Sequence, residues 1–304
     1  MAMQTLVNLF IKIFIMIGVG YFLRKREVIS GQLKQGMNHL IMNVILPFSV
    51  IASGNSDFSS EMSQNLMEAA VFSVIYYLGA MAIGMLAARV LHLEERRGRI
   101  FMMLTTFANV GFLGIPLSTE LFGSEGALIA VVNNLGFDVI FFTFGVYYVS
   151  REGSFELKKI FGNVVAMSAI FAVALYCSPF RLPAVIEDTF RTIGNSMVPL
   201  SMMTIGCGLA EVKITEVLKN RLAYLVSAMR LLIYPLAALL IAKAVGMDHV
   251  TAAACVMLTA MPPGSTNAII AEQYDCAPEF ATQAVVQSMV LMLATLPLIM
   301  MLVS

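Results

Sequence analysis

This chain has few charged side chains. Charged residues make up 12% of its 304 residues and apolar residues 59%, whereas an average soluble domain is roughly 25% charged. A soluble protein of this length could not bury so much apolar surface, so most of it must face lipid or other membrane spans. The formal net charge is zero, which argues against a nucleic-acid partner, since such a partner needs a basic surface.

Several kinds of site motif are also missing. The four cysteines (Cys177, Cys207, Cys255 and Cys276) lack the spacing of a metal site or a disulfide framework, so we expect them to pack and expect no metal or cofactor. Neither His-Glu-x-x-His nor Gly-x-Ser-x-Gly occurs, which argues against an intramembrane enzyme. No cleavable signal peptide is expected, because the basic residues 24–26 follow the first apolar stretch rather than precede it.

Apolar segments of membrane-spanning length recur along the whole chain. Crossing the hydrocarbon core of a bilayer takes about 20 apolar residues. With that length, the spans are predicted at 3–23, 33–54, 66–90, 99–122, 126–149, 158–178, 189–209, 221–245, 249–273 and 279–303. The sequence therefore predicts an all-α membrane protein with ten transmembrane helices.

Basic residues are divided unevenly between alternate loops. Fourteen belong to the loops after spans one, three, five and seven: Arg24, Lys25, Arg26, Lys34, Arg89, Arg96, Arg97, Arg99, Arg151, Lys158, Lys159, Lys213, Lys219 and Arg221. The opposite loops hold only Arg181, Arg191 and Lys243. Because basic loops stay cytoplasmic, we expect both termini outside a plasma or inner membrane. The ninth loop, with Asp275 and Glu279 and no basic residue, departs from this pattern.

A short motif occurs once in each half of the chain. Asn43-x-x-x-Pro47-x-Ser49 returns as Asn195-x-x-x-Pro199-x-Ser201, 152 positions later. Five spans per half is an odd number, so the second half must cross the membrane in the inverted sense. We therefore predict two inverted repeats, residues 1–152 and 153–304.

Each half also has one apolar span that contains helix breakers. Span four contains Asn109-Val-Gly111-Phe-Leu-Gly114-Ile-Pro116, and span nine contains residues 261–267, Met-Pro-Pro-Gly-Ser-Thr-Asn. Glycine and proline are tolerated at bilayer depth mainly where the freed backbone lines a cavity or packs in protein. Broken spans at matching positions of two halves indicate a transporter's binding site. Two ordinary proline kinks are the alternative, although they leave the residues after the second break unexplained.

These breaks predict two helix starts near the middle of the membrane. We expect one near Gly114, with Pro116 in its first turn. The other follows Pro262-Pro263, where flexible backbone and capping side chains are supplied by Gly264, Ser265, Thr266 and Asn267. Each start would point free N–H groups and a positive dipole end at the bilayer centre, which suits a carboxylate. Asn109 and Asn267 would add neutral hydrogen bonds.

Three ionisable residues fall inside the predicted spans, where such groups are functional candidates by default. Asp138 and Arg230 lie at similar depth, so pairing between them is possible. The alternatives are a buried ion pair that locks two helices, exchange of a proton or cation by Asp138 during transport, and a polar contact with the substrate. Asn133 or Asn134, about one turn before Asp138, is expected to face the same interior surface. Lys12 binds an anion or extends its stem along a helix interface.

At these residues the sequence resembles the auxin efflux carrier family, which includes bacterial carriers of malate- and malonate-like anions. The resemblance covers essentially the whole chain. Its most specific parts are Asn109-x-x-x-x-Gly114-Ile-Pro116-Leu117 and Met261-Pro262-x-Gly264 through Ala271-Glu272-x-Tyr274. It implies a fold like that of the bile-acid/sodium symporters. Spans one, two, six and seven would form a scaffold, and spans three to five and eight to ten would form a transport domain with spans four and nine crossed.

The resemblance also implies roles for single residues. Asn109 would contact the substrate carboxylate, Pro116 and Pro262 would mark the crossover, and Asn163 would lie near the cytoplasmic mouth. Plant relatives often have a proline after that asparagine and a long central loop. Here Val164 follows and the central loop is short, so the sequence does not specify an auxin-like substrate. A homodimer formed through the scaffold is a further implication.

The function expected from the sequence is secondary transport of a small organic anion by elevator-type alternating access, coupled to protons or Na⁺. A sodium/proton antiporter with Asp138 as its ion ligand is the alternative within transport. It is weakened because Asp138 is the single central carboxylate in the predicted spans. A receptor or sensor would bind a ligand without flux.

Overall fold

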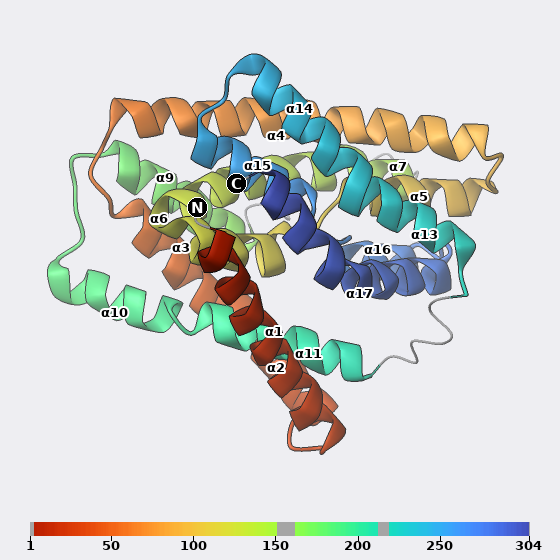
Figure 1. The fold of residues 1–304 in the computed structure, drawn as a ribbon, viewed down its shortest axis with the longest axis horizontal. Helices are drawn as coiled ribbons and strands as arrows, with labels where there is room; N and C mark the ends of the chain where they lie inside the picture. Colours follow the sequence, from red (N-terminus) through yellow and green to blue (C-terminus); the bar gives the residue numbers. More distant parts are fainter. Residues whose placement is uncertain (1–2, 151–161, 212–218, 304) are drawn as a thin grey trace.

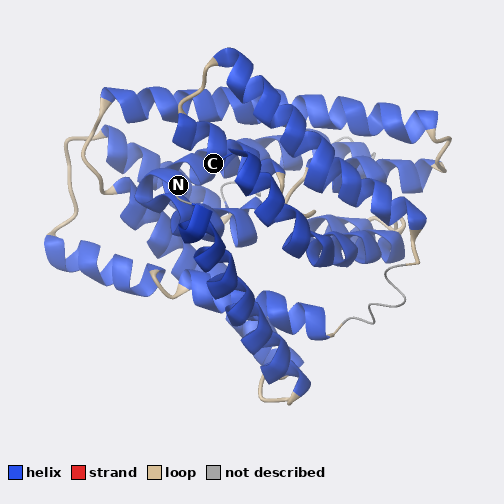
Figure 2. Cartoon of the chain, viewed as in Figure 1, coloured by secondary structure: helices blue, strands red, loops and turns tan. Residues whose placement is uncertain are grey.

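The computed structural model describes residues 3–150, 162–211 and 219–303 (Figure 1). Within these ranges the protein is helical, and Figure 2 shows helices joined by short loops. The extended backbone recorded there is one isolated antiparallel bridge between Ala108 and Pro263. The all-α class is therefore confirmed for this part of the chain. The basic loop residues Arg151, Lys158, Lys159 and Lys213 lie outside the described residues.

The helices follow one another with few long connections. In chain order they are α1 Met3–Lys25, α2 Gly31–Leu40, η1 Ile41–Ile45, α3 Leu46–Gly54, α4 Ser60–Val90, α5 Glu95–Thr106, η2 Val110–Gly114, α6 Ile115–Ile140, η3 Phe141–Gly145, α7 Val146–Ser150, α9 Val164–Cys177, α10 Ala184–Gly194, α11 Met197–Ala210, α13 Arg221–Ala228, η4 Met229–Ile233, α14 Tyr234–Val245, α15 His249–Thr259, α16 Ser265–Gln273 and α17 Pro278–Val303. The η segments are single π-helical turns within longer helical runs.

Seven helical runs in the described residues are long and apolar enough to cross a membrane. They are Val7–Lys25, Gly31–Gly54, Ser60–Val90, Val110–Ser150, Ala184–Ala210, Arg221–Val245 and Pro278–Val303. Two shorter apolar helices, α9 and α15, come in addition. The run Val110–Ser150 includes parts of two predicted spans, and Gly123 at φ 67° bends it between them. A count of ten spans stays a prediction.

Three of the π-helical turns come directly before a proline. Pro47, Pro116 and Pro235 stand in the first turns of α3, α6 and α14, immediately after η1, η2 and η4. Proline cannot donate the usual helical hydrogen bond, and a wider turn shifts the bonding register so that the helix continues past it.

The repeated motif adopts two different local structures. Its first copy, around Asn43, lies in the continuous run from α2 to α3, where the Asn43 amide donates to the His39 carbonyl at 2.9 Å. Its second copy lies where α10 ends at Gly194 and α11 begins at Met197, with Asn195 directly after the end of α10. The predicted span 189–209 is therefore interrupted.

Helices from the two halves of the chain approach each other closely at glycines. A Cβ on Gly206 of α11 would lie 1.9 Å from the Ile17 carbonyl oxygen of α1, and one on Gly54 of α3 would lie 2.4 Å from the Ala172 oxygen of α9. Such spacing allows backbones to pack directly, as is common between membrane helices. These two helix pairs belong to predicted spans one, seven, two and six.

Two short helices lie deepest in the molecule. Residues 101–104 of α5 are fully buried, and residues 254–258 of α15 are at most 1% exposed. Figure 1 shows α15 enclosed by longer helices. Both helices end just before the two breaks that the sequence predicted, so these breaks lie in the protein interior rather than against lipid.

Candidate functional site

The two helix breaks lie against each other. The Asn109 amide N donates to the Pro262 carbonyl at 2.8 Å, and the Gly264 amide N donates to the Phe107 carbonyl at 3.2 Å. Together with the Ala108–Pro263 bridge, these bonds satisfy backbone groups that the breaks release, as buried backbone requires. The interruptions expected in spans four and nine are thus present, between 107 and 109 and between 260 and 264.

The first helix restarts earlier than the sequence suggested. Its second part begins at Val110 with η2, and Asn109 is the residue before that first turn. The Asn109 carbonyl accepts from the amide N atoms of Leu113 at 3.3 Å and Gly114 at 3.1 Å. A start near Gly114 was wrong because it assumed an α-helical turn, whereas the π-helical turn accommodates Pro116 one turn further on.

The second restart is not capped by side chains. Gly264 occupies the capping position before α16, and no side-chain cap bond forms there. Asn267 instead is fully buried, and its amide donates to the carbonyls of Phe107 at 2.8 Å and Gly264 at 3.0 Å. The capping expectation was wrong because a side chain caps from the position before the helix, which glycine holds. Asn267 therefore joins the two breaks.

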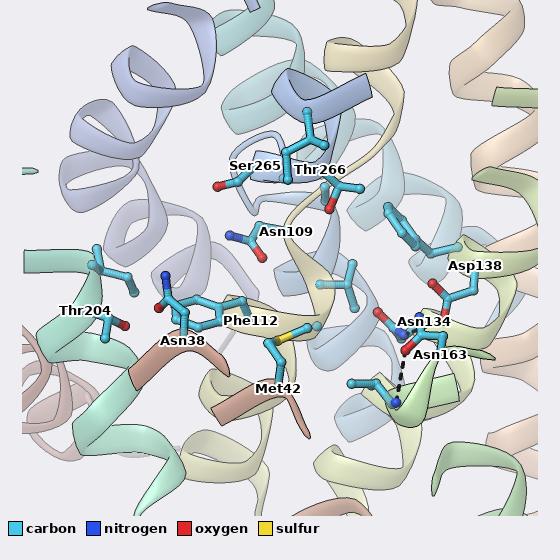
Figure 3. A pocket seen from close by; sticks show the side chains of 18 of the residues that line it. Asn38, Met42, Asn109, Phe112, Asn134, Asp138, Asn163, Thr204, Ser265 and Thr266 are labelled. Carbon is cyan, nitrogen blue, oxygen red and sulfur yellow. Dashed lines mark hydrogen bonds between the residues drawn. The ribbon is translucent and has the colours of Figure 1, made fainter. Parts of the chain in front are cut away.

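Both new helix starts line one cavity of about 470 Å³ (Figure 3). The lining residues include Val110, Gly111 and Phe112 at one start, and Gly264, Ser265 and Thr266 at the other. The first N–H groups of a helix have no partner within that helix, and the helix dipole adds partial positive charge. The cavity is thus bordered by two positive backbone ends.

Neutral polar side chains dominate the polar part of the cavity wall. Figure 3 shows Asn109 near its middle, with Ser265 and Thr266 on one side and Asn38 on the other. The polar set is Asn38, Asn109, Asn134, Asn163, Thr204, Ser265 and Thr266, and the apolar side chains include Met42, Phe112, Phe137, Phe142, Ile205, Ile269 and Met289. The charged members are Lys34 and Asp138.

The sequence-predicted residues divide into two groups. Those that line the cavity are Asn109, Gly111, Asn134, Asp138, Asn163, Gly264, Ser265 and Thr266. Those that do not are Pro116, Pro262, Asn267, Asn133, Arg230, Lys12, Asn43, Pro47, Asn195 and Pro199. Of the two neighbouring asparagines, Asn134 faces the cavity, whereas the Asn133 side-chain oxygen accepts from the Tyr77 hydroxyl at 3.0 Å.

Asp138 and Arg230 have separate partners. Asp138 is 3% exposed and accepts a hydrogen bond from the Asn134 amide at 3.0 Å. The fully buried Arg230 donates from Nε and Nη2 to the Met261 carbonyl, at 3.2 and 3.0 Å. Its Nη1 donates to the Thr106 carbonyl at 3.0 Å and to the Tyr76 hydroxyl. The ion-pair interpretation was therefore wrong.

Arg230 lies where two helices finish. Thr106 is the last residue of α5, and Met261 follows the end of α15. The final carbonyls of a helix lack partners within it and carry partial negative charge, so a guanidinium with several donors suits both ends at once. The positive N-terminal ends of the two restarted helices therefore border the cavity, whereas the negative C-terminal ends of α5 and α15 contact Arg230.

Lys12 lies away from the cavity. Its ammonium forms an ion pair with Glu120 of α6, and its side chain is 60% exposed. Asn163 does line the cavity, where its side-chain oxygen caps α9 by accepting from the amide N atoms of Val165 at 3.0 Å and Ala166 at 3.4 Å. Its position next to the described start of α9 also gives it a structural role.

Sequence reasoning missed the face that α2 presents to the cavity. Lys34, Asn38 and Met42 recur every fourth residue and line it together, a helical spacing that marks one face. The Asn38 oxygen is buried without a partner among the described residues. That periodicity was the available signal, but Lys34 was counted only as a loop charge.

The Lys34 ammonium is already paired at the edge of the cavity. It forms an ion pair with Glu211, at the end of α11, which also accepts from Arg24 Nε at 2.8 Å. Burial by itself raises the pKa of the Glu211 carboxyl, but the hydrogen bonds and positive charges of Lys34 and Arg24 outweigh it and hold that pKa below its usual range. Glu211 therefore stays ionised, and its single negative charge is shared between Lys34 and Arg24.

Comparisons with known proteins give consistent matches. A family model described as "Membrane transport protein" matches residues 5–165 and 153–300. The chain is 25% identical over 298 residues to an uncharacterized transporter of Methanothermobacter thermautotrophicus, covering 95% of each chain. It is 21% identical over 299 residues to the uncharacterized transporter YfdV of Escherichia coli K12, covering 94% of each. Over 140 residues it is 24% identical to auxin efflux carrier component 1 of Arabidopsis thaliana, which is 45% of this chain and 22% of the plant protein.

Proposed function

Since this chain belongs to the membrane transport protein family, we propose that it is a secondary active transporter of a small organic anion. The family and the matched relatives are transporters rather than enzymes, and the likeness to auxin efflux carriers is confirmed. The proposed substrates are carboxylates or dicarboxylates of the malate, malonate or auxin type. The observation that carries the proposal is the pair of helix starts that border one cavity beside Asn109.

The donors in this cavity fit a carboxylate that must be released again. Backbone N–H groups at a helix start bind anions without a full positive charge. Asn109, Ser265 and Thr266 can add neutral hydrogen bonds, and Lys34, the cation among the lining residues, is held at the edge of the cavity by its ion pair with Glu211. The apolar part of the wall, with Phe112 among its residues, suits the carbon skeleton of such a substrate.

Asp138 supplies a reason for proton coupling. Its carboxylate lines the same cavity as the proposed anion site, and like charges at short range repel strongly in a poorly solvated site. A protonated Asp138 removes this repulsion and turns its carboxyl into a hydrogen-bond donor. Anion and proton would then enter together, which makes the proton the proposed coupling ion.

The transport cycle that we propose is an elevator. The chain would have ten spans in two inverted repeats, 1–152 and 153–304, with spans four and nine crossed at the paired breaks. The glycine contacts of α1 with α11 and of α3 with α9 support a rigid scaffold, against which spans three to five and eight to ten would slide. Both termini would be extracytoplasmic, and two copies would associate through the scaffold.

Ligand-induced stabilisation of the purified protein tests the site. Dicarboxylates, monocarboxylates and indole acids are screened with and without Na⁺. A compound that is a substrate should raise the melting temperature of the protein, because a ligand that binds only the folded state stabilises it by mass action. Asn109→Ala should abolish that rise and uptake into proteoliposomes. Asn43→Ala, an exposed asparagine outside the cavity, is the matched control. Undiminished uptake by Asn109→Ala would rule the site out.

Substituting Asp138 tests the coupling. Asp138→Asn mimics the protonated carboxyl, so we expect it to bind the anion at least as tightly as the wild type at neutral pH. Its uptake should no longer respond to an imposed pH gradient. The measurement is substrate uptake into proteoliposomes with and without that gradient. A variant that still follows the gradient would show that the proton moves through another group.

A sodium/proton antiporter is the second candidate, favoured by the carboxylate of Asp138 in the cavity. The described residues contain no group of three His, Cys, Asp or Glu side chains that could hold a metal ion, so a cation there would have few charged ligands. Stabilisation by Na⁺ alone, with no response to any carboxylic acid, would select this function over anion transport.

A further inference from the structure

A second large cavity lies between α4 and α14 and shares no residue with the first. Figure 1 shows these two helices beside each other along one edge of the molecule. The groove has a volume of about 500 Å³. Its rim is open to the outside, with Ile75 64% exposed and Ile241 53% exposed, whereas Phe72, Ala80 and Ala238 are buried beneath. In a membrane protein, an open apolar groove of this kind faces lipid.

One acidic side chain interrupts the apolar wall of this groove. Glu68 lines it, and no lysine, arginine or histidine does. Its Oε1 accepts from the Gln64 amide at 3.1 Å. Its Oε2 is buried and has no partner among the described residues. A buried carboxylate oxygen without a partner is unfavourable, so Glu68 provides a charge for which the described chain supplies no counterion.

The depth of Glu68 matches the level of lipid headgroups. The segment 69–88 of α4, which follows it directly, contains no charged residue. Twenty helical residues rise about 30 Å, the thickness of the hydrocarbon core. Glu68 therefore stands at the boundary of that core, while the groove continues along α4 as far as Ile83. A ligand with a cationic head and an apolar tail fits both features.

We propose that this groove binds a phospholipid with a primary-amine headgroup, such as phosphatidylethanolamine. Its ammonium would donate to the Glu68 carboxylate, which would turn its buried Oε2 toward the groove to meet it, and one acyl chain would lie in the groove against Phe72 and Tyr76. Tyr76 is the residue whose hydroxyl accepts from Arg230. The bound lipid would thus pack against the arginine contact that holds the ends of α5 and α15.

Thermal unfolding in detergent with added lipid tests the proposal. Phosphatidylethanolamine should raise the melting temperature of the wild type by several degrees, and phosphatidylcholine with the same acyl chains should do so much less, because its quaternary ammonium has no N–H to donate. Glu68→Gln should weaken the apparent affinity for phosphatidylethanolamine roughly tenfold and abolish the preference between the two lipids. Equal responses of the wild type to both lipids would overturn the headgroup assignment.

Filling the groove provides a second, independent readout. Gly79 lines the groove, and a Cβ on it meets nothing within 4 Å, so Gly79→Leu should fold and block the acyl chain. Ala237→Leu, also exposed and groove-lining, serves if Gly79→Leu is poorly expressed. Gly18→Leu is the matched control, since Gly18 is exposed on α1 and equally unhindered.

The stabilisation by phosphatidylethanolamine should persist in Gly18→Leu and disappear in the groove-filling variants. A full lipid response in both groove-filling variants would overturn the proposal. So would a change in oligomeric state, measured by native mass spectrometry, that appears in Gly79→Leu without any change in lipid binding. In that case the groove would hold a second copy of the chain. None of these readouts depends on which anion the protein transports.

Discussion

At the residue scale, Arg230 is a buried side chain that binds backbone carbonyls at the ends of two helices. Its side chain donates to the carbonyl of Thr106, the last residue of α5, and to that of Met261, just after α15. Its sequence position predicted importance but not the partner, because depth along a span says nothing about lateral neighbours. Only the fold shows that the groups facing it are carbonyl ends rather than Asp138.

Removing the Arg230 guanidinium should destabilise the protein severely. Arg230→Gln leaves buried carbonyls such as those of Thr106 and Met261 without their donor, at a cost of about 1–3 kcal/mol for each unsatisfied group. The check is thermal unfolding of the purified variant. Arg191→Gln, which removes an exposed ion pair with Glu187, should cost less than about 1 kcal/mol. Equal melting temperatures for the two variants would contradict this role.

Asn267 illustrates the limit of residue-level reading. The sequence suggested that it caps a helix and contacts the substrate. Its amide donors are instead occupied by two carbonyls, and it does not line the cavity. An asparagine after a break is equally compatible with capping, clamping or binding, and the choice depends on which residue occupies the capping position.

At the element scale, helix identity could be predicted better than helix ends. The positions of the breaks followed from proline and glycine, because their backbone chemistry acts locally. The π-helical turn that starts at Val110 was not predicted, because Pro116, which follows it, is equally compatible with a kink or with a new helix start. The interruption after Gly194 was not predicted either.

The pair α1 and α11 offers a test at this scale. Gly206→Ala would place a methyl group 1.9 Å from the Ile17 carbonyl oxygen, which forces the helices apart. We expect a loss of stability of about 1–3 kcal/mol, as in other overpacked interiors. Gly18→Ala, on α1 with nothing within 4 Å, should be neutral or stabilising. Thermal unfolding of both variants decides, and an unaffected Gly206→Ala would show that the helices do not touch there.

At the scale of the whole molecule, one carboxylate joins three helices at a common end. Glu211 follows α11 and binds Arg24 of α1 and Lys34 of α2. Because the pKa of its carboxyl is lowered in the folded state, its contribution to stability is present above the pKa of the unfolded chain. That contribution is lost as the pH falls through the lower folded value.

Acid titration should reveal this linkage. Between neutral pH and about pH 4, near the ordinary pKa of glutamate, the wild type should retain this contribution and then lose it on further acidification. Glu211→Gln should be less stable than the wild type at neutral pH, and its stability should fall less steeply as the pH is lowered below about 4. Asp275→Asn, which removes an exposed ion pair with Arg96, is the control. An equally steep loss of stability with falling pH in the wild type and in Glu211→Gln would contradict the assignment.

Composition indicated helices in a membrane, and the two breaks, which the sequence located, line one cavity. The contribution of α2 to the cavity could not be read in the same way. Lys34 and Asn38 reach it only because α2 packs beside α11, and such lateral packing depends on contacts between segments far apart in the sequence.

The bonds between the two breaks have a consequence for biosynthesis. Phe107 and Asn267, which share a hydrogen bond, are separated by 160 residues. The Asn109 amide N likewise bonds to the carbonyl of Pro262, which is far away in the sequence. If the first half inserts into the bilayer while the later segments are still being synthesised, the backbone groups of the earlier break have no hydrogen-bond partners from the second break. Insertion of the amino-terminal portion must therefore be provisional, with water or the insertion machinery shielding that backbone until its distant counterpart arrives.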